Sequence, residues 1–311
     1  MTTANRNLAQ RLRQGVFLAL LGFALVHVHA QMAPTAPTQR TDRDHSPIAI
    51  SSLPSGALSV LTFRGGLSVI NSGTSRQTPL KASLGNFTPL DMAAALVGDQ
   101  EFIFVTMYWV FSTQSTQGNE GVIVQYSLQG QEVRKWSALG RVFAGIAVDG
   151  DHQVAYLGNA SGGDISTLNL ADSASPKFAI HVTGASMIGP LALDKEGQRL
   201  FAADLGAGTI YVVDLAGRKS RLLVSGLGEP AALAYEPSQH KLYIADAGRH
   251  RISQVSVDAT NPKASDYSVG DLHEPRGLAV EPNHSVWVAD FGAGTVLQLS
   301  GTGQVLTTVR P

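Results

Sequence analysis

The 311-residue chain contains no cysteine. This absence excludes a disulfide framework, a thiolate metal site, a cysteine nucleophile and a lipid-anchored cysteine. The fold must therefore be held by buried apolar surface alone. A chain of nearly 300 residues can achieve this, because folding hides about three quarters of its surface. We expect one large closed domain.

Basic charge is also scarce. The chain has 23 lysines and arginines against 24 aspartates and glutamates, which gives a net charge of −1, and its basic residues form no cluster. Nucleic-acid binding depends on many phosphate contacts from lysine and arginine. Nucleic acid is therefore not an expected partner.

Long apolar runs are missing except near the start. The run from Val16 to Val26 follows three arginines and precedes Val28-His29-Ala30. It is shorter than the roughly 20 residues that a membrane-spanning helix needs. The pattern is typical of a signal peptide at residues 1–30, cleaved near Ala30. It predicts an exported protein, periplasmic or extracellular, with a net charge of −4 and no membrane span in the mature chain.

The segment from Gln31 to His45 is rich in proline and threonine and has no apolar period. Such a composition cannot bury enough apolar surface to fold, so residues 31–45 are predicted to be a disordered leader. The folded domain is expected to occupy residues 46–311.

Three stretches of that domain have nearly the same sequence, at residues 200–210, 242–252 and 286–296. Their aspartates Asp204, Asp246 and Asp290 are 42 and 44 residues apart. This spacing falls in the range of roughly 40 to 45 residues that is typical of a four-stranded propeller blade. The apolar run before each aspartate has no polar alternation, which indicates a strand buried on both faces.

Weaker copies of this pattern extend it toward the N-terminus. First strands are predicted to begin near residues 47, 92, 144, 190, 231 and 276, and the outer strand of the first blade is predicted at Pro79–Ala82. The fold class is therefore all-β, a six-bladed β-propeller of four-stranded antiparallel blades. Either Val305–Val309 forms the last outer strand, or a strand from the N-terminus closes the ring.

The repeat also resembles a known family. The pattern proline, small residue, Gly-Leu-Ala-Val, a short turn and then Val-Ala-Asp resembles the NHL-repeat propellers, most clearly at residues 230–252 and 275–296. The run Arg249-His250-Arg251-Ile252 is similar to that family's Asn-His-Arg-Ile. NHL propellers are mostly recognition or scaffold modules, and lyases and lactonases share the fold. The resemblance therefore implies architecture more than activity.

In length and strand pattern the chain is also similar to gluconolactonase-like propellers. Their divalent-metal site uses a glutamate near the first blade and asparagines just before the first strands. The positions that match here are Asp91, Ala144, Gly189, Ala231 and Arg276. Of these only Asp91 can bind a hard cation, and calcium takes six or more oxygens. We therefore expect no metal site and no cofactor.

The repeated aspartates have a structural interpretation. A residue that recurs in every blade serves the blade, and an aspartate before a glycine-containing turn accepts hydrogen bonds from turn amides. Asn159 is expected to have the same role. The histidines His152, His240 and His284 are expected in the turns between first and second strands, without a shared metal.

Asp91 and Arg276 do not recur between blades. Both are predicted near the start of an innermost strand, where side chains can face the central channel. Glu229, His273 and Glu274 are expected beside them on connecting loops. The five residues form the candidate binding site, where Asp91 and Arg276 either orient an anionic ligand or form an ion pair with no ligand.

The run Met107–Phe111 also departs from the repeat, and a polar segment from Ser112 to Glu120 follows it. Tyr108 and Trp109 are candidate anchors for a partner, since both residue types are favoured at protein interfaces. The alternative is a longer strand packed on the neighbouring blade.

The function predicted from the sequence is therefore an exported NHL-type binding or scaffold module with no catalytic residues. A protein or small-molecule ligand would dock at one face of its central channel. The alternative is a divergent lactone hydrolase or lyase with Ca²⁺ or another divalent cation near Asp91. A cluster of three or more carboxylate or amide oxygens at the channel mouth would favour that enzyme.

Overall fold

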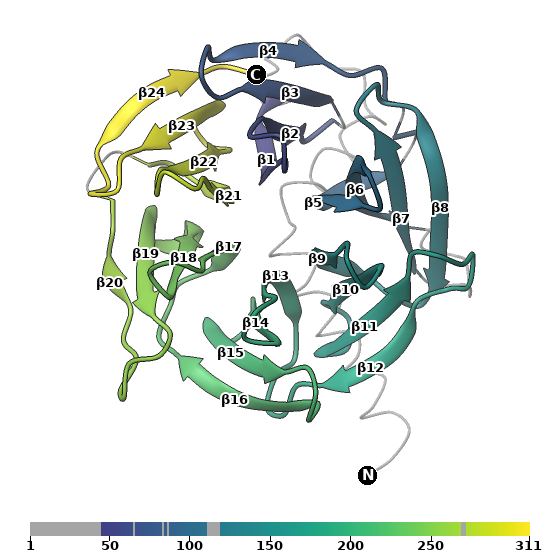
Figure 1. Cartoon of the computed structure of the whole chain (residues 1–311). Coiled ribbons are helices and arrows are strands. Elements are labelled where there is room, and N and C mark those ends of the chain that lie inside the picture. The colour runs from purple at the N-terminus through teal and green to yellow at the C-terminus, as the bar shows by residue number, and fades with distance from the viewer. Residues whose placement is uncertain (1–44, 65, 83, 86, 111–118, 269–271) are drawn as a thin grey trace, which may run out of the picture. The chain divides into compact units, whose positions relative to one another are not determined.

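The computed structural model describes residues 45–311 except 65, 83, 86, 111–118 and 269–271. The predicted signal peptide and nearly all of the predicted leader lie outside the described residues. Within the described residues the strands form six four-stranded antiparallel sheets, arranged around a central channel (Figure 1). This confirms the six-bladed β-propeller.

Each blade consists of four strands that are consecutive in the chain. Blades 1 to 3 contain β1 Pro47–Ser52, β2 Leu58–Thr62, β3 Leu67–Asn71 and β4 Arg76–Pro79; β5 Thr88–Val97, β6 Gln100–Val110, β7 Asn119–Ser127 and β8 Glu132–Leu139; and β9 Phe143–Asp149, β10 Val154–Asn159, β11 Asp164–Asn169 and β12 Lys177–His181. Blades 4 to 6 contain β13 Ile188–Asp194, β14 Arg199–Asp204, β15 Thr209–Asp214 and β16 Lys219–Val224; β17 Pro230–Glu236, β18 Lys241–Asp246, β19 Arg251–Ser256 and β20 Ser265–Asp266; and β21 Pro275–Val280, β22 Val286–Asp290, β23 Thr295–Leu299 and β24 Val305–Val309. A short 3-10 helix, η3, covers Ala247–Arg249.

The strand ends agree with the repeat in most places. All six innermost strands begin within four residues of the predicted positions. The outer strand of blade 1 differs, since β4 covers Arg76–Pro79 rather than Pro79–Ala82. Pro79 is the last residue of this outer edge strand, a position where proline is tolerated.

Every innermost strand has an irregularity in its pairing near its start, where a β-bulge adds residues to that strand. Asp91 directly follows the bulge of β5, and Gly145, Ala232 and Gly277 do so in blades 3, 5 and 6. Arg276 lies inside the bulge of β21, one position earlier. The sequence alignment that made Asp91 and Arg276 equivalent is therefore wrong by one residue.

An aromatic residue recurs at one position of the second strand, where it packs within and between blades. In blades 2 to 6 a second-strand aromatic pairs with an alanine of the innermost strand. Blade 1 has Ser59 opposite Ser51 at this position. Four of the five aromatics are buried, and Tyr156 is partly buried. The aromatics are Phe104, Tyr156, Phe201, Tyr243 and Trp287.

Between some blades the backbones are in close contact. A Cβ atom added to Gly145 would lie 1.9 Å from the carbonyl oxygen of Gly189, on the next innermost strand. One added to Gly277 would lie 2.9 Å from the Cα atom of Ala49. Glycine is needed at these positions because no side chain fits between the strands.

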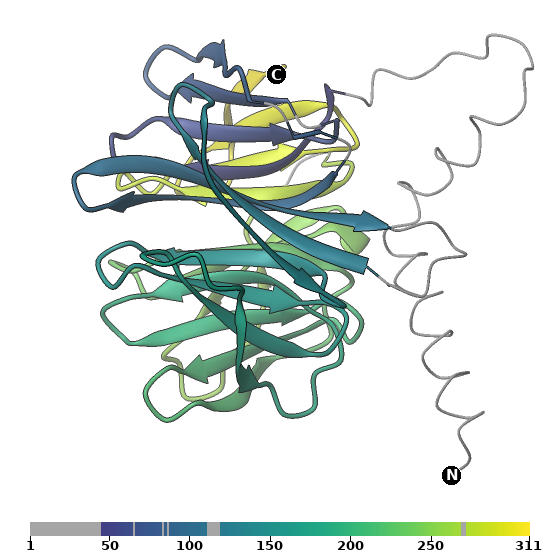
Figure 2. The same ribbon diagram turned by 90° about the vertical axis from the view of Figure 1, so that its right-hand side faces the viewer.

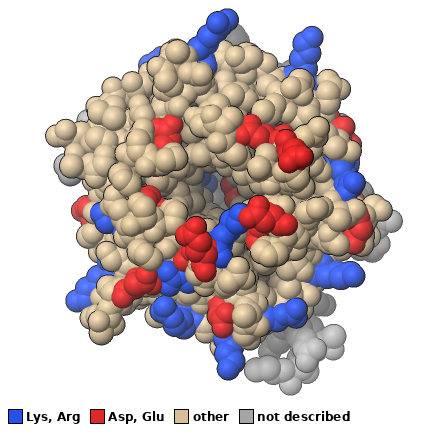
Figure 3. All heavy atoms as spheres, in the orientation of Figure 1, with Lys and Arg blue, Asp and Glu red and all other residues tan. Residues whose placement is uncertain are grey.

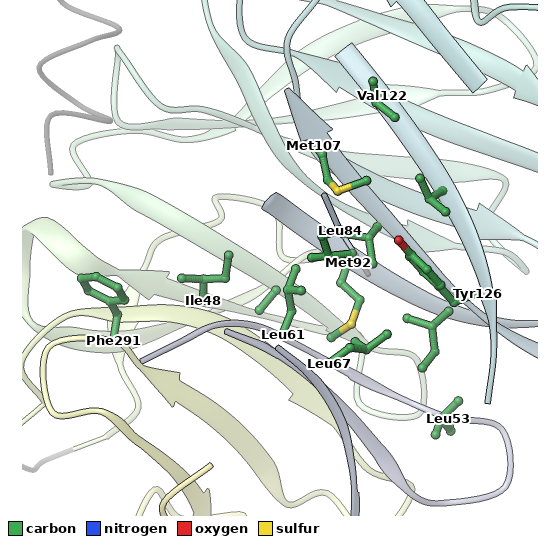
Figure 4. Close-up of a cluster of buried hydrophobic side chains, with 14 residues drawn as sticks. Ile48, Leu53, Leu61, Leu67, Leu84, Met92, Met107, Val122, Tyr126 and Phe291 are labelled. Carbon is green, nitrogen blue, oxygen red and sulfur yellow. The ribbon is translucent and has the colours of Figure 1, made fainter. Parts of the chain in front are cut away.

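The ring closes without sharing a strand between its first and last blades. β24, at Val305–Val309, is the outer strand of blade 6, so no N-terminal strand takes that place. Trp287 packs in one cluster with Ile50, Leu58 and other residues of blade 1. Phe291 follows β22 and joins the cluster between blades 1 and 2 beside Ile48 (Figure 4).

Blade 2 has longer strands than the others, and β6 and β7 project at one end of the ring (Figure 2). No helix among the described residues is long and apolar enough to cross a membrane.

Candidate functional site

The innermost strands β1, β5, β9, β13, β17 and β21 line a central cavity of about 360 Å³. Figure 3 shows the ring hollowed at its centre, with acidic and basic side chains around part of the rim. Most of the lining residues are small or aliphatic. Asp91 is the one charged side chain among the described residues that line this cavity.

Asp91 is half-buried, and backbone groups of two blades hold its carboxylate. Oδ1 accepts a hydrogen bond from the Met92 N–H at 2.8 Å, and Oδ2 accepts one from the Ile146 N–H of blade 3 at 3.1 Å. Burial raises the pKa of Asp91 to about 7, although both hydrogen bonds act in the opposite direction. Near neutral pH Asp91 is therefore able to accept or release a proton.

Arg276 lies at the end of the channel where the innermost strands begin. Its Nε donates to Glu274 Oε1 at 2.7 Å, and its Nη2 lies 2.6 Å from the same oxygen and 3.5 Å from Glu229 Oε1. The guanidinium also lies over Phe291, 5.8 Å from the ring centroid. Among the described residues, Arg276 therefore forms its ion pairs with these glutamates and not with Asp91.

The loops that carry the two glutamates are held by repeated aspartates. Asp246 accepts from the Glu229 N–H at 3.0 Å, and Asp290 accepts from the N–H groups of His273 and Glu274 at 2.9 and 2.8 Å. The side chain of His273 is 64% exposed. The structure therefore brings Glu229, Glu274 and Arg276 together, with His273 beside them and Asp91 in the adjoining channel.

The turn-amide role predicted for the repeated aspartates is confirmed for Asp204 and Asp290, whereas Asp246 accepts from the loop before its blade. Asp204 accepts from the N–H groups of Gly206 and Ala207 in the following turn, and also from Ser186 N–H. Ser186 lies just before β13, so this aspartate also fixes the loop that enters its own blade. Asn159 accepts in the same way from Val142 N–H at 3.3 Å.

A second set of buried acids was missed. Asp149, Asp194 and Glu236 end three of the innermost strands, and Glu281 directly follows a fourth. All four bond to the turns that follow. The sequence contained the signal, because an acid recurs at the same place in four repeats. These residues serve the blades, as the repeated aspartates do.

The predicted turn histidines lie beside this second set. His152 Nδ1 is 2.8 Å from Asp149 Oδ2, and His284 Nδ1 is 3.5 Å from Glu236 Oε1 of the preceding blade. His240 Nδ1 is 2.8 Å from Asp258 Oδ2. The histidines therefore pair separately with carboxylates.

The aromatic run after Met107 forms the end of the long strand β6. Tyr108 is only 4% exposed, and burial raises its pKa. Trp109 is half-buried, and its ring lies 5.5 Å from that of Phe87 in an edge-to-face contact. The buried position of Tyr108 agrees with the alternative given above, a longer strand that packs on its neighbours. Most of the polar segment predicted to follow lies outside the described residues.

The described residues contain no group of three or more histidine, aspartate or glutamate side chains placed to hold a metal ion. Asp91 has two backbone donors as its hydrogen-bond partners, and Glu229 and Glu274 are paired with Arg276. The oxygen cluster that would favour the metal-dependent enzyme is therefore not found in this part of the chain.

Comparisons with known proteins agree with the architecture. Residues 178–310 match the family model described as SMP-30/Gluconolactonase/LRE-like region. No curated protein sequence matches the chain.

Among solved structures, a chain of the nidogen/laminin complex is similar with 16% identity and a TM-score of 0.61, over 86% of this chain and 94% of that one. Virginiamycin B lyase from Staphylococcus aureus is similar with 11% identity and a TM-score of 0.57, over 87% and 86%. A streptogramin B lyase has 13% identity and a TM-score of 0.57, over 81% and 93%. Identities this low show the fold alone. The chain is thus a six-bladed β-propeller whose C-terminal part matches the SMP-30/gluconolactonase/LRE-like region.

Proposed function

We propose that this protein is an exported binding module that receives a protein or small-molecule ligand where its innermost strands begin. The observation that supports this most is the group of Arg276, Glu229 and Glu274. These charged side chains do not recur between blades, and they lie at one end of a channel whose described walls hold one further charged group, Asp91.

The backbone around this group favours binding. Asp246 and Asp290 fix the loops that carry the two glutamates, so little conformational freedom remains to be lost when a ligand docks. The side chain of Arg276 is 25% exposed, and those of Glu229 and Glu274 are 24% and 20% exposed. A ligand can therefore contact groups whose positions are already set.

The similarity to a chain of the nidogen/laminin complex supports a role in protein recognition at the level of the fold. Export is a separate part of the proposal, and it is supported by the short apolar run that follows three arginines. Protein recovered after secretion should begin at Gln31.

The second candidate is a lactone hydrolase or lyase with a divalent cation near Asp91. The match of residues 178–310 to the gluconolactonase-like model favours it, and so does the pKa of Asp91 near 7. Shifted carboxyl groups are concentrated at functional sites. The missing oxygen cluster makes this candidate weaker than a binding module.

A thermal-shift screen separates the two functions, because a ligand that binds only the folded state raises the melting temperature. The panel contains calcium, magnesium, sugars, lactones and short acidic, basic and neutral peptides. We expect at least one organic ligand to stabilise the protein and its affinity to fall about tenfold in Arg276→Ala, which is about 1.4 kcal/mol.

The matched control is Arg221→Ala, because Arg221 is exposed on the outer strand β16, away from the channel. Unchanged affinity in Arg276→Ala would place the ligand elsewhere. Stabilisation by calcium or magnesium that disappears in Asp91→Asn, together with lactone turnover, would favour the enzyme.

A further inference from the structure

The channel has the size of a small-ligand site. Its volume of about 360 Å³ falls within the range of roughly 300 to 1,000 Å³ that is usual for such sites. Most of the residues that line it are small or aliphatic, but the surface that they expose to the channel is mainly polar. Leu191, Leu233 and Leu278 are themselves buried.

Asp91 is not explained by the repeat. At the same position blades 1, 3, 5 and 6 have Ala49, Gly145, Ala232 and Gly277, which are all small. At the two glycines the next innermost strand approaches too closely for a Cβ atom. The other seams of the ring therefore form without a carboxylate, and Asp91 is a departure from the way this fold is built.

The Asp91 carboxylate retains capacity for further hydrogen bonds. An ionised carboxylate offers about four lone-pair sites, and the Met92 and Ile146 N–H groups occupy two of them. The residue lines the cavity, so the remaining sites are available to a molecule inside it. A donor with positive charge suits them best, because charge-assisted hydrogen bonds are the strongest kind.

Charge at the adjoining mouth also favours a cation. Arg276 contributes one positive charge, whereas Glu229 and Glu274 contribute two negative ones. With ionised Asp91 the group has a net charge of −2. A mouth of this sign attracts cations and repels anions, which argues against the anionic ligand that Arg276 suggested in the sequence.

A metal ion fits this site poorly, since calcium takes six or more oxygens and Asp91 is the one carboxylate on the described walls. An organic ammonium needs one carboxylate and a few further acceptors. The innermost strands are edge strands of their sheets, and an edge strand presents unpaired carbonyl groups.

We propose that the channel binds a primary ammonium compound, with the Asp91 carboxylate as its counter-ion. The inference rests on the binding function proposed above and names the ligand class of that site. The ammonium group would donate to Asp91 and to further acceptors on the mainly polar channel wall.

The test uses three probes of one shape: hexylamine, hexan-1-ol and hexanoate. Binding of each to the full exported protein is measured by calorimetry at pH 8. We expect hexylamine to bind at least about tenfold more tightly than the other two, and Asp91→Asn to remove that preference. The control Asp99→Asn removes the same charge from the exposed β5–β6 turn and should leave the preference unchanged.

The pH dependence of the wild-type protein gives a second readout. The described groups that bond to Asp91 are the N–H groups of Met92 and Ile146 and the Thr106 hydroxyl, and none of these titrates near pH 7. Since the pKa of Asp91 is about 7, hexylamine affinity should rise between pH 6 and pH 8 as the carboxyl ionises. His273→Asn should keep this dependence, which assigns it to Asp91 rather than to the exposed histidine of the mouth.

Asp91→Asn is expected to fold. A folded-state pKa above the ordinary value means that the folded state favours protonated Asp91 over ionised Asp91. The stability that the protonated form contributes is lost as the pH rises through 7. Removing the charge should therefore not lower stability at pH 8. Equal binding of the three probes, or a hexylamine preference that survives in Asp91→Asn, would overturn the inference. If instead a ligand of the earlier panel binds through Arg276, the binding function stands and only the ligand class is wrong.

Discussion

At the scale of single residues, the repeated aspartates are charged groups that the fold has taken out of water. Asp204, Asp246 and Asp290 are 0% exposed. Burying a carboxylate is unfavourable unless hydrogen bonds replace its lost water, and each of these aspartates accepts several from backbone N–H groups. Because the donors lie on the loop before the innermost strand of the same blade, each aspartate fixes where its blade begins.

Asp246→Ala should lower the free energy of unfolding by about 3 kcal/mol. The substitution removes the carboxylate that accepts from the Gly228 and Glu229 N–H groups, and hydrogen bonds to a charged group contribute roughly 1.5 to 3 kcal/mol. Urea unfolding measures the change. Asp214→Ala is the control, because Asp214 is exposed and accepts only from Ala216, so its loss should cost under about 1 kcal/mol. Equal losses in the two variants would contradict the role assigned to the buried aspartates.

The sequence was informative about residues that repeat and less so about those that do not. The role of Asp204 could be predicted because its neighbours recur in other blades. The relation between Asp91 and Arg276 could not, because the β-bulges change the count of residues without a sequence signal. The sequence placed Glu229 and Glu274 near Arg276, but it did not predict that these glutamates, rather than Asp91, would pair with it.

At the scale of elements, the residue that faces the next blade determines how closely neighbouring innermost strands approach. Gly145 on β9 allows the backbone of Gly189 to approach, whereas Asp91 on β5 reaches the Ile146 N–H with its side chain. The periodicity of the sequence predicted where these strands begin, because burial on both faces leaves a continuous apolar run. It did not predict which glycines contact a neighbouring strand, since that depends on packing between blades.

Gly145→Ala should destabilise the protein by about 3 kcal/mol or more. The new Cβ atom would lie 1.9 Å from a backbone oxygen, so β9 and β13 would have to separate, and overpacking commonly costs roughly 1 to 3 kcal/mol even where side chains can adjust. The matched control is Gly301→Ala, where the closest atom to the new Cβ would be 4.0 Å away. Chemical denaturation of both variants measures the difference. A Gly145→Ala protein as stable as the control would show that the strands can move apart freely.

At the scale of the whole molecule, the ring is held closed by side chains. Blades 1 and 6 are each built from consecutive strands, so no strand joins the two ends of the domain. Trp287 and its cluster cover that junction, Ser52 Oγ donates to the Val280 carbonyl across it at 3.1 Å, and Phe63 packs edge-to-face on Phe291 at 5.8 Å. The number of blades was readable from the repeat length, but this mode of closure was not, because Val305–Val309 could equally have been replaced by an N-terminal strand.

Trp287→Ala should therefore open the ring at one place. Truncating a buried aromatic costs roughly 3 to 5 kcal/mol, and here the loss falls on the one junction that no loop between blades spans. Hydrogen exchange should accelerate first in β1, β2, β21 and β22. Phe201→Ala is the matched control, since Phe201 is equally buried at the equivalent position of blade 4, between blades joined by the chain. It should cost a similar free energy while leaving exchange in blades 1 and 6 close to that of the wild type. If both variants instead accelerate exchange evenly around the ring, the junction is no weaker than the other seams, and the propeller unfolds as a single cooperative unit.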